Sequence, residues 1–149
     1  MALTQPPLPG ALNRLILLVL TGCIGLASAA LAAPVPFRGG TGSHVVVDVL
    51  VNGDGPFAFL VDTGSSHTVV TTATAARVRA PRVAKAEVST PAGTQWAAVV
   101  RLDRLAFGPV NLTGLLATEL SSPLPGGDVV AGVLGLDALS SRPFTLDYE

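Results

Sequence analysis

The stretch PFAFLVDTGS, residues 56–65, places an acid at the end of an apolar run. We expect the run to form a buried strand that gives Asp62 the rigid, partly desolvated support that a water-activating carboxylate requires. In the turn that follows, Thr63 offers a hydroxyl to the backbone, Gly64 leaves room for a close approach, and Ser65 brings a hydroxyl beside the carboxylate. The stretch therefore predicts a catalytic acid, with an ordinary Asx-type turn at a strand end as the alternative.

The sequence before this run predicts a hairpin that leads into the acid. Residues 44–51, HVVVDVLV, are rich in β-branched side chains and predict a strand. The Asn-Gly-Asp-Gly sequence at 52–55 is typical of a tight hairpin turn, because these dipeptides accept positive φ. After the acid, we expect a strand at 67–71 and one or two helical turns at 72–79, with Thr72 as the N-cap.

Short extended segments, separated by glycine and proline, continue through the rest of the chain. They are expected at residues 83–90, 94–107, 110–118, 129–135 and 144–148, with a loop at 121–128 and a short helix at 136–140. The 149 residues are 49% hydrophobic and 13% charged, which excludes a disordered chain. The frequent short strands predict an all-β barrel or sandwich with one or two short helices.

Charge and metal-binding residues exclude several classes of function. The net charge is −1 and no basic run is present, so nucleic acid is not an expected partner. Cys23 is the only cysteine, and the two histidines, His44 and His67, do not have the spacing of metal ligands. We expect both histidines to be structural, and we expect no metal and no cofactor.

A second motif lies near the end of the chain, where residues 132–139 read GVLGLDAL. Two large apolar residues, a glycine and a short helix, placed downstream of Asp-Thr-Gly-Ser, resemble the retropepsin-like aspartyl protease family of the bacterial, gag-polyprotein-like, single-domain type. The resemblance covers about residues 44–148. It implies a closed β-barrel of the acid-protease fold, in which Val133, Leu134 and Gly135 lie behind the catalytic loop and fix it.

The resemblance also implies roles for individual residues. Asp62 matches the catalytic acid, Thr63 would tie two catalytic loops together, and Ser65 would support the carboxylate. Family members cover the substrate with a β-hairpin flap, and Ala92-Gly93-Thr94 has the position of its tip. Trp96 follows, and either a core position or a place in the cleft is open to it.

One copy of the motif has a consequence for the reaction. The resemblance implies an aspartic endopeptidase, in which two carboxylates activate a water molecule for attack on a peptide bond. Asp137 and Asp147 are not followed by Thr-Gly or Ser-Gly, so neither resembles a second catalytic acid. We therefore expect a homodimer that contributes Asp62 twice and acts on peptides or proteins. The alternative is an inactive exported β-domain that binds peptides or an envelope protein.

The N-terminus is typical of a targeting segment. Arg14 precedes an uncharged apolar stretch that ends in small residues, so residues 1–33 are expected to be a signal peptide or a retained membrane anchor. A third reading is lipidation of Cys23, because Leu-Thr-Gly-Cys resembles a lipobox. We then expect a linker at 34–43 and the protease domain at 44–149, exported to the periplasm or the extracellular space, or held at the membrane. At the other end of the chain, family members usually continue beyond the strand expected at 144–148. A minimal protein and a truncated reading frame are therefore both open expectations.

Overall fold

The computed structural model describes residues 34–39, 44–90, 93–121, 123–125, 127–141 and 143–145. They belong to one of two compact units of the chain, residues 32–149. The predicted targeting segment at 1–33, which includes Cys23, lies outside the described residues.

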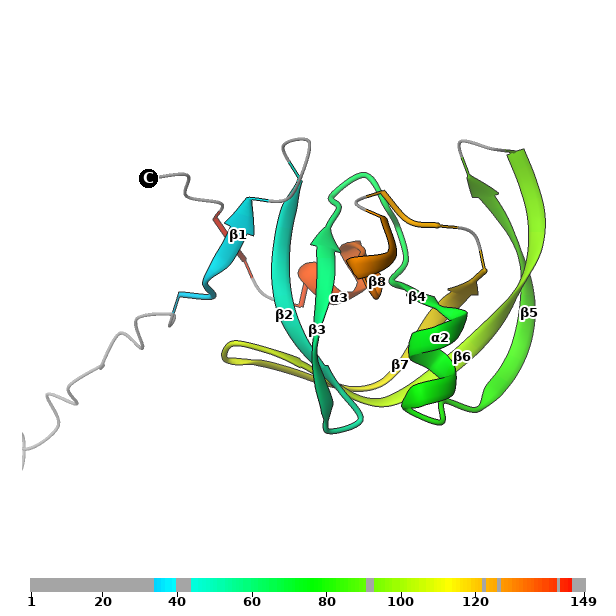
Figure 1. Cartoon of the computed structure of the whole chain (residues 1–149), viewed down its shortest axis with the longest axis horizontal. Coiled ribbons are helices and arrows are strands. Elements are labelled where there is room, and N and C mark those ends of the chain that lie inside the picture. The colour runs from blue at the N-terminus through cyan, green and yellow to red at the C-terminus, as the bar shows by residue number, and fades with distance from the viewer. Residues whose placement is uncertain are drawn as a thin grey trace, which may run out of the picture. The chain divides into compact units, whose positions relative to one another are not determined.

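Short strands dominate the described residues, and two short helices accompany them (Figure 1). In chain order the elements are β1 (Phe37–Gly39), β2 (Val45–Val51), β3 (Asp54–Val61), β4 (Val69–Thr71), α2 (Thr72–Arg77), β5 (Arg82–Thr90), β6 (Gly93–Phe107), β7 (Val110–Leu120), a 3-10 turn (Gly127–Val129), β8 (Gly132–Leu134) and α3 (Leu136–Leu139). The predicted all-β class with one or two short helices is confirmed.

The strands close into a barrel. Neighbouring strands pair in the order β2-β3-β8-β4-β7-β6, and a further pairing of β2 with β6 completes the ring. This seam is short: it pairs Leu50 with Ala106 and Val51 with Leu105. Strands β1 and β5 extend the sheet at its two margins. The expected closed barrel is therefore present.

The seam is extended by the turn between β2 and β3. Asn52 and Gly53 both have positive φ, 52° and 88°, which is the two-residue hairpin turn that the sequence predicts. The Asn52 backbone N–H donates to the Arg104 carbonyl at 2.8 Å, and its side-chain oxygen accepts from the Arg104 N–H at 3.0 Å. Its side-chain amide also donates to the Val78 carbonyl at 3.3 Å. One turn residue therefore connects β2, β6 and the end of α2.

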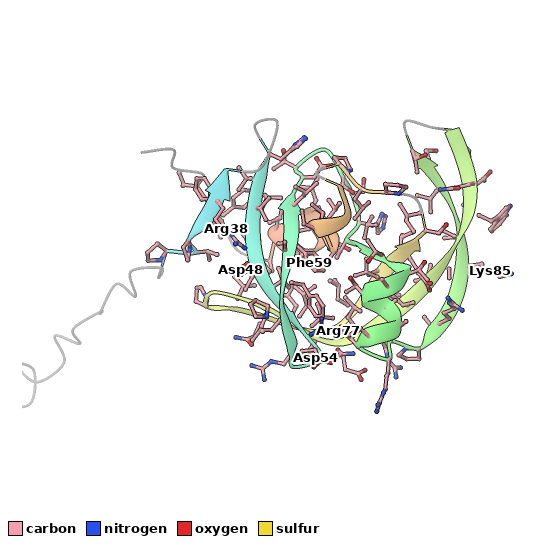
Figure 2. The ribbon with its side chains drawn as sticks, viewed as in Figure 1. Arg38, Asp48, Asp54, Phe59, Arg77 and Lys85 are labelled. Carbon is pink, nitrogen blue, oxygen red and sulfur yellow. The ribbon has the colours of Figure 1, made fainter. Side chains whose placement is uncertain are left out.

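Alternation of side chains along the strands fills the barrel. On β2 the odd-numbered valines are buried, while Asp48 and Leu50 are exposed on the other face. The largest fully buried side chains are Phe59, Leu102, Leu105 and Leu134. Figure 2 shows Phe59 inside the barrel. Burying each of these side chains contributes roughly 1.5–3 kcal/mol to folding.

Three local expectations differ from the structure. The predicted linker at 34–43 contains β1, because Phe37 packs against the core cluster and its strand pairs with β2. The N-cap of α2 is Thr71, whose hydroxyl accepts from the Thr74 N–H at 3.2 Å, so Thr72 is the first helical residue instead. Of the strand predicted at 144–148, residues 144 and 145 are not in a strand, and the others lie outside the described residues.

Candidate active site

Asp62 lies at the end of β3, at the start of the loop that leads to β4. Strand β8 runs between β3 and β4, parallel to β3 and antiparallel to β4 (Figure 1). The ladder between β3 and β8 ends with the pair Val61 and Leu134, and the Asp62 N–H donates to the Leu134 carbonyl at 3.1 Å. The backbone of the acid is therefore fixed by the strand that carries the second sequence motif.

Strand β3 is buried on both of its faces next to the acid. Phe59 points into the barrel core, whereas Leu60 belongs to a second apolar cluster with Leu124, Val130 and Val133. A strand covered on both sides resembles the centre of a packed sheet more than a solvated edge. This packing provides the rigid support for Asp62 that the apolar run predicts.

The Asp62 carboxylate itself is open to solvent in the single chain. One of its oxygens accepts from the Gly64 N–H at 2.8 Å, and the Asp62 carbonyl accepts from the Ser65 N–H at 3.3 Å. The missing side chain of Gly64 leaves this approach free, since a Cβ there would lie 3.2 Å from the carboxylate oxygen. The turn therefore orients one carboxylate oxygen and leaves the residue exposed.

The two hydroxyls of the motif do not contact this carboxylate. The Ser65 hydroxyl donates to the His67 carbonyl at 2.8 Å, so the expectation that it lies on the Asp62 carboxylate does not fit the single chain. Its role in the structure is to stabilise the turn, because a serine hydroxyl readily bonds backbone two residues away. Thr63 is exposed. Among the described residues its hydroxyl has no hydrogen-bond partner, so its predicted contact with a second catalytic loop stays a prediction.

Gly135 allows the loop to pack against β8 and α3. A Cβ at this position would lie 2.4 Å from the His67 carbonyl carbon and 2.6 Å from the His67 oxygen. Real Cβ atoms do not come so close to backbone, so only glycine fits here without a shift. His67 contributes backbone to this contact, and its side chain is exposed.

Thr68 and Asp137 form a pair below this loop that was not predicted from the sequence. Thr68 is completely buried, its N–H donates to one Asp137 carboxylate oxygen at 3.0 Å, and its hydroxyl donates to the other at 2.7 Å. The Thr68 hydroxyl also accepts from the Gly135 N–H at 3.3 Å. The pair is 69 positions apart, so no local pattern signals it. The position of Asp137 just after the Val-Leu-Gly motif was the only available signal.

The predicted flap corresponds to the hairpin of β5 and β6, the long ribbon at one side of the barrel (Figure 1). Gly93 and Thr94 begin β6 at its tip, and Ala92 lies outside the described residues. The Thr90 hydroxyl donates to the Gly93 carbonyl at 2.9 Å, and Gly93 has a φ of 116°. Gly93 therefore has a conformation that favours glycine, and its place at the tip of a flap stays a prediction.

Trp96 does not belong to the core, because 71% of it is exposed. It pairs directly with Glu87 on β5, and Lys85 shares that face of the hairpin because it lies two residues from Glu87. Figure 2 shows Lys85 pointing away from the barrel. Trp96 therefore lies on the outer face of the hairpin and not in the core, and a place in the cleft stays a prediction.

The base of this hairpin is tied down by an ion pair. Arg82, the first residue of β5, donates twice to the Glu119 carboxylate, at 2.7 and 2.6 Å. The Glu119 side chain is nearly inaccessible, whereas most of the Arg82 side chain is exposed. The hydrogen bonds from Arg82 are the main cause that lowers the pKa of Glu119. The Glu119 carboxylate is therefore ionised at neutral pH, and both of its oxygens are bonded to Arg82.

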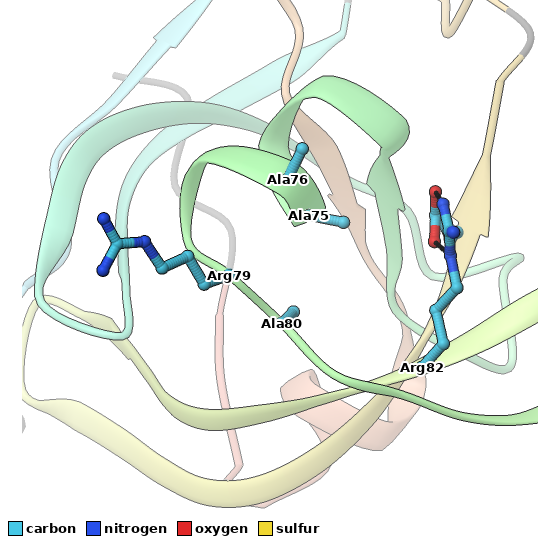
Figure 3. Close-up of a pocket in the computed structure, with 6 residues that line it drawn as sticks. Ala75, Ala76, Arg79, Ala80 and Arg82 are labelled. Carbon is cyan, nitrogen blue, oxygen red and sulfur yellow. Dashed lines mark hydrogen bonds and ion pairs between the residues drawn. The ribbon is translucent and has the colours of Figure 1, made fainter.

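A cavity of about 430 Å³ lies beside this ion pair, under α2 (Figure 3). Alanines 75, 76 and 80 line it together with Arg79, Arg82 and Glu119. Figure 3 shows Arg79 and Arg82 extending in different directions, so the two cations do not converge on one ligand. The cavity contains no residue of the loop that carries Asp62.

The part of the chain that the structure describes has neither a metal-binding cluster nor a membrane-spanning helix. No group of three or more His, Cys, Asp or Glu side chains there could hold a metal ion. No helix there is long and apolar enough to cross a membrane.

Comparison with known proteins connects this geometry to a family. A family model described as "Aspartyl protease" matches residues 47–138. Among solved structures, the chain is similar to a retropepsin-like aspartic protease from Rickettsia conorii, with a TM-score of 0.53, 21% identity, and coverage of 70% of this chain and 75% of that one. It is also similar to EIAV protease complexed with the inhibitor HBY-793, with a TM-score of 0.49, 20% identity, and coverage of 76% and 94%. No curated protein sequence matches.

Proposed function

The chain belongs to the aspartyl protease family, and from this premise we propose that it is an endopeptidase whose active site forms between two copies of the chain. Each copy would contribute one Asp62. The observation that carries the proposal is the state of Asp62 in the single chain: its backbone is fixed by β8, one carboxylate oxygen is oriented by Gly64, and the carboxylate faces solvent.

Among the residues that the structure describes, Asp137 is the acid bonded to this loop, and it is not available for the same chemistry. Asp137 already accepts hydrogen bonds from the N–H and the hydroxyl of Thr68, and Thr68 is completely buried. This supports the proposal that the second catalytic carboxylate comes from another copy of the chain. A two-fold axis that passes close to Asp62 would bring the same loop of each subunit together.

Two carboxylates that face each other can share a single proton, because like charges at that separation cannot both ionise. The ionised carboxylate takes a proton from a bound water molecule as the water attacks the carbonyl carbon of the peptide bond. The protonated carboxyl donates its proton to the carbonyl oxygen. The carboxyl that took the water proton then passes it to the amide nitrogen, the C–N bond breaks and the amine leaves. One hydroxyl of the tetrahedral species returns its proton to the other carboxylate, which restores the pair. The proposed substrate is a peptide or a protein segment in extended form.

Replacing the acid tests the assignment directly. We expect Asp62→Asn to reduce kcat/KM for peptide cleavage by about 10²–10⁴-fold or more, since it removes the general acid and base together. Its unfolding midpoint should stay close to that of the wild type, because the side chain is exposed. Asp103→Asn, on the exposed side of β6, is a matched control and should retain activity. Full activity in Asp62→Asn would contradict the proposal.

Mixing subunits tests the shared site. We would co-express wild-type and Asp62→Asn chains with two different tags and isolate the mixed dimers. A mixed dimer holds one carboxylate and should not cleave peptides, so an equal mixture that exchanges freely should keep about one quarter of the wild-type activity. About half of the activity would instead mean that each chain acts alone. A strict monomer at high concentration would support the inactive, peptide-binding reading.

The location of the protein is a separate proposal, which rests on the sequence of residues 1–33. We propose export, with the segment cleaved, retained as an anchor, or lipidated at Cys23. The mass of the mature chain in fractionated cells distinguishes cleavage from retention. Incorporation of labelled lipid that is lost in Cys23→Ser would identify lipidation. Full-length protein in the soluble cytoplasmic fraction would contradict export.

A further inference from the structure

The acid of the second motif, Asp137, has more contacts than the start of a short helix requires. Its Oδ1 accepts from the N–H of Ala138 at 2.8 Å, which is an ordinary contact in the first turn of α3. Its other two contacts, from the N–H and the hydroxyl of Thr68, leave the helix and reach the far end of the acid loop. The start of the helix explains the first contact but not the other two.

Those two contacts complete a series of bonds between the acid loop and residues 134–137. The Asp62 N–H donates to the Leu134 carbonyl at 3.1 Å, at the beginning of the loop. The N–H groups of Leu136 and Asp137 donate to the carbonyls of Ser65 and Ser66 at 2.8 and 3.3 Å, in its middle. The Asp137 side chain holds Thr68 at its end. The loop is therefore bonded at its start, middle and end to one short segment.

The end of the loop depends on Asp137 more than the other points do. Thr68 has no accessible surface, so water cannot replace the carboxylate as a partner of its N–H and hydroxyl. A buried donor that loses its partner is unfavourable, and the backbone relieves this by moving toward solvent or toward another acceptor. Such a movement begins six residues after Asp62, within the same loop.

We propose that Asp137 is a positioning residue, which acts through Thr68 to hold the Asp62 loop in the geometry that the reaction needs. Asp137 does not touch the substrate or the reacting water. Its effect on catalysis rests on the proposed function, because two Asp62 carboxylates share a proton only when both loops keep their position. A displacement of about 1 Å in such a site can reduce the rate by about 10²-fold.

The test removes the contacts between Thr68 and Asp137 and follows both the loop and the reaction. Thr68→Val keeps the buried volume and removes the hydroxyl, Thr68→Ser restores it, and Asp137→Ala removes the carboxylate. Thr74→Val is the matched control, since Thr74 is also a buried threonine, and its hydroxyl bonds the Ala131 carbonyl away from the acid loop. Hydrogen exchange at the Leu136 and Asp137 amides reports on the loop, because these amides donate to the carbonyls of Ser65 and Ser66.

We expect Thr68→Val and Asp137→Ala to speed exchange at these two amides at least about 10-fold relative to amides of β6 and β7. In the same variants kcat should fall by about 10–100-fold while KM changes less than about twofold, because the acid moves and the substrate surface does not. Thr68→Ser should restore both quantities, and Thr74→Val should change neither. The double variant should lose less than the sum of the two single changes, since both remove the hydrogen bond between the Thr68 hydroxyl and Asp137.

Two results would overturn the proposal. One is exchange that rises equally throughout the barrel, which means that Asp137 only contributes to global stability. The other is faster exchange at Leu136 with an unchanged kcat, which means that the loop needs no fixing. If Asp137→Ala does not fold, Asp137→Asn is measured instead. This change keeps the shape of the side chain and turns one hydrogen-bond acceptor into a donor. A wild type without peptidase activity would refute the proposed function, while exchange at Leu136 would still decide whether Asp137 holds the loop.

Discussion

The acid loop and the β5–β6 hairpin, which is the candidate flap, are held in opposite ways. The loop leaves a strand that is buried on both faces and is bonded along its length to residues 134–137. The hairpin is held by its own ladder and, at its base, by the pair of Arg82 and Glu119. Its tip and its outer face are exposed. The chain thus fixes the acid and leaves the candidate flap with few restraints, as a cover that must admit a substrate requires.

The largest expected effect comes from removing a core side chain on the strand that carries the acid. Phe59→Ala should lower the free energy of unfolding by about 3–5 kcal/mol, because Phe59 is fully buried and leaves a cavity. Trp96→Ala, on the outer face of the hairpin, should change it by less than about 0.5 kcal/mol. Urea unfolding of both variants measures the contrast. Equal losses would mean that the hairpin face is covered in solution, and the contrast would fail.

A second pair of changes compares two glycines. Gly135→Ala would place a Cβ 2.4 Å from the His67 backbone and should destabilise the protein by about 2–3 kcal/mol or more, because backbone cannot move aside as a side chain can. Gly93→Ala meets nothing within 4 Å, and the strain of its positive φ should cost about 1 kcal/mol. Thermal unfolding of the two variants gives the order. A milder effect at Gly135 than at Gly93 would show that the acid loop yields easily.

The smallest effect is expected at the hairpin base and depends on pH. The hydrogen bonds from Arg82 lower the pKa of Glu119, so the folded state favours the ionised carboxylate. The resulting stabilisation is present above the ordinary carboxyl pKa of about 4.3 and is lost as the pH falls through the lower pKa of the folded state. The stability difference between wild type and Glu119→Gln should therefore shrink below about pH 4. Urea midpoints at neutral and acid pH measure it, and a difference that grows in acid would have the wrong sign.

Local patterns predicted the parts of the fold that local physics decides. The Asn-Gly turn, the apolar strand before Asp62 and the Val-Leu-Gly element each follow from a few neighbouring residues, and all three lie where they were expected. The β-branched run of β2 likewise required only its own alternation. These features predicted a barrel or sandwich with the acid at a strand end, and the family resemblance implied the closed barrel.

The remaining features depend on residues that are far apart in the sequence. Thr68 and Asp137 meet only because β8 runs between β3 and β4, and no pattern within either segment reveals it. The Ser65 hydroxyl donates to the His67 carbonyl, a partner that the motif alone does not indicate. The exposure of Trp96 follows from the twist and length of a hairpin that leaves the barrel, whereas a lone tryptophan in a β-rich sequence suggests burial.

The turn at Asn52 and Gly53 has a consequence for engineering this protein. An exposed two-residue hairpin tip is normally the first choice for inserting a tag, a fluorophore or a new chain terminus. Here the turn also helps to close the barrel. Asn52 hydrogen-bonds β6 and the end of α2, beside a β2–β6 seam of only two residue pairs. An insertion at this tip would break the hydrogen bonds of Asn52 and weaken the closure of the barrel, so labels for this protein belong elsewhere on its surface.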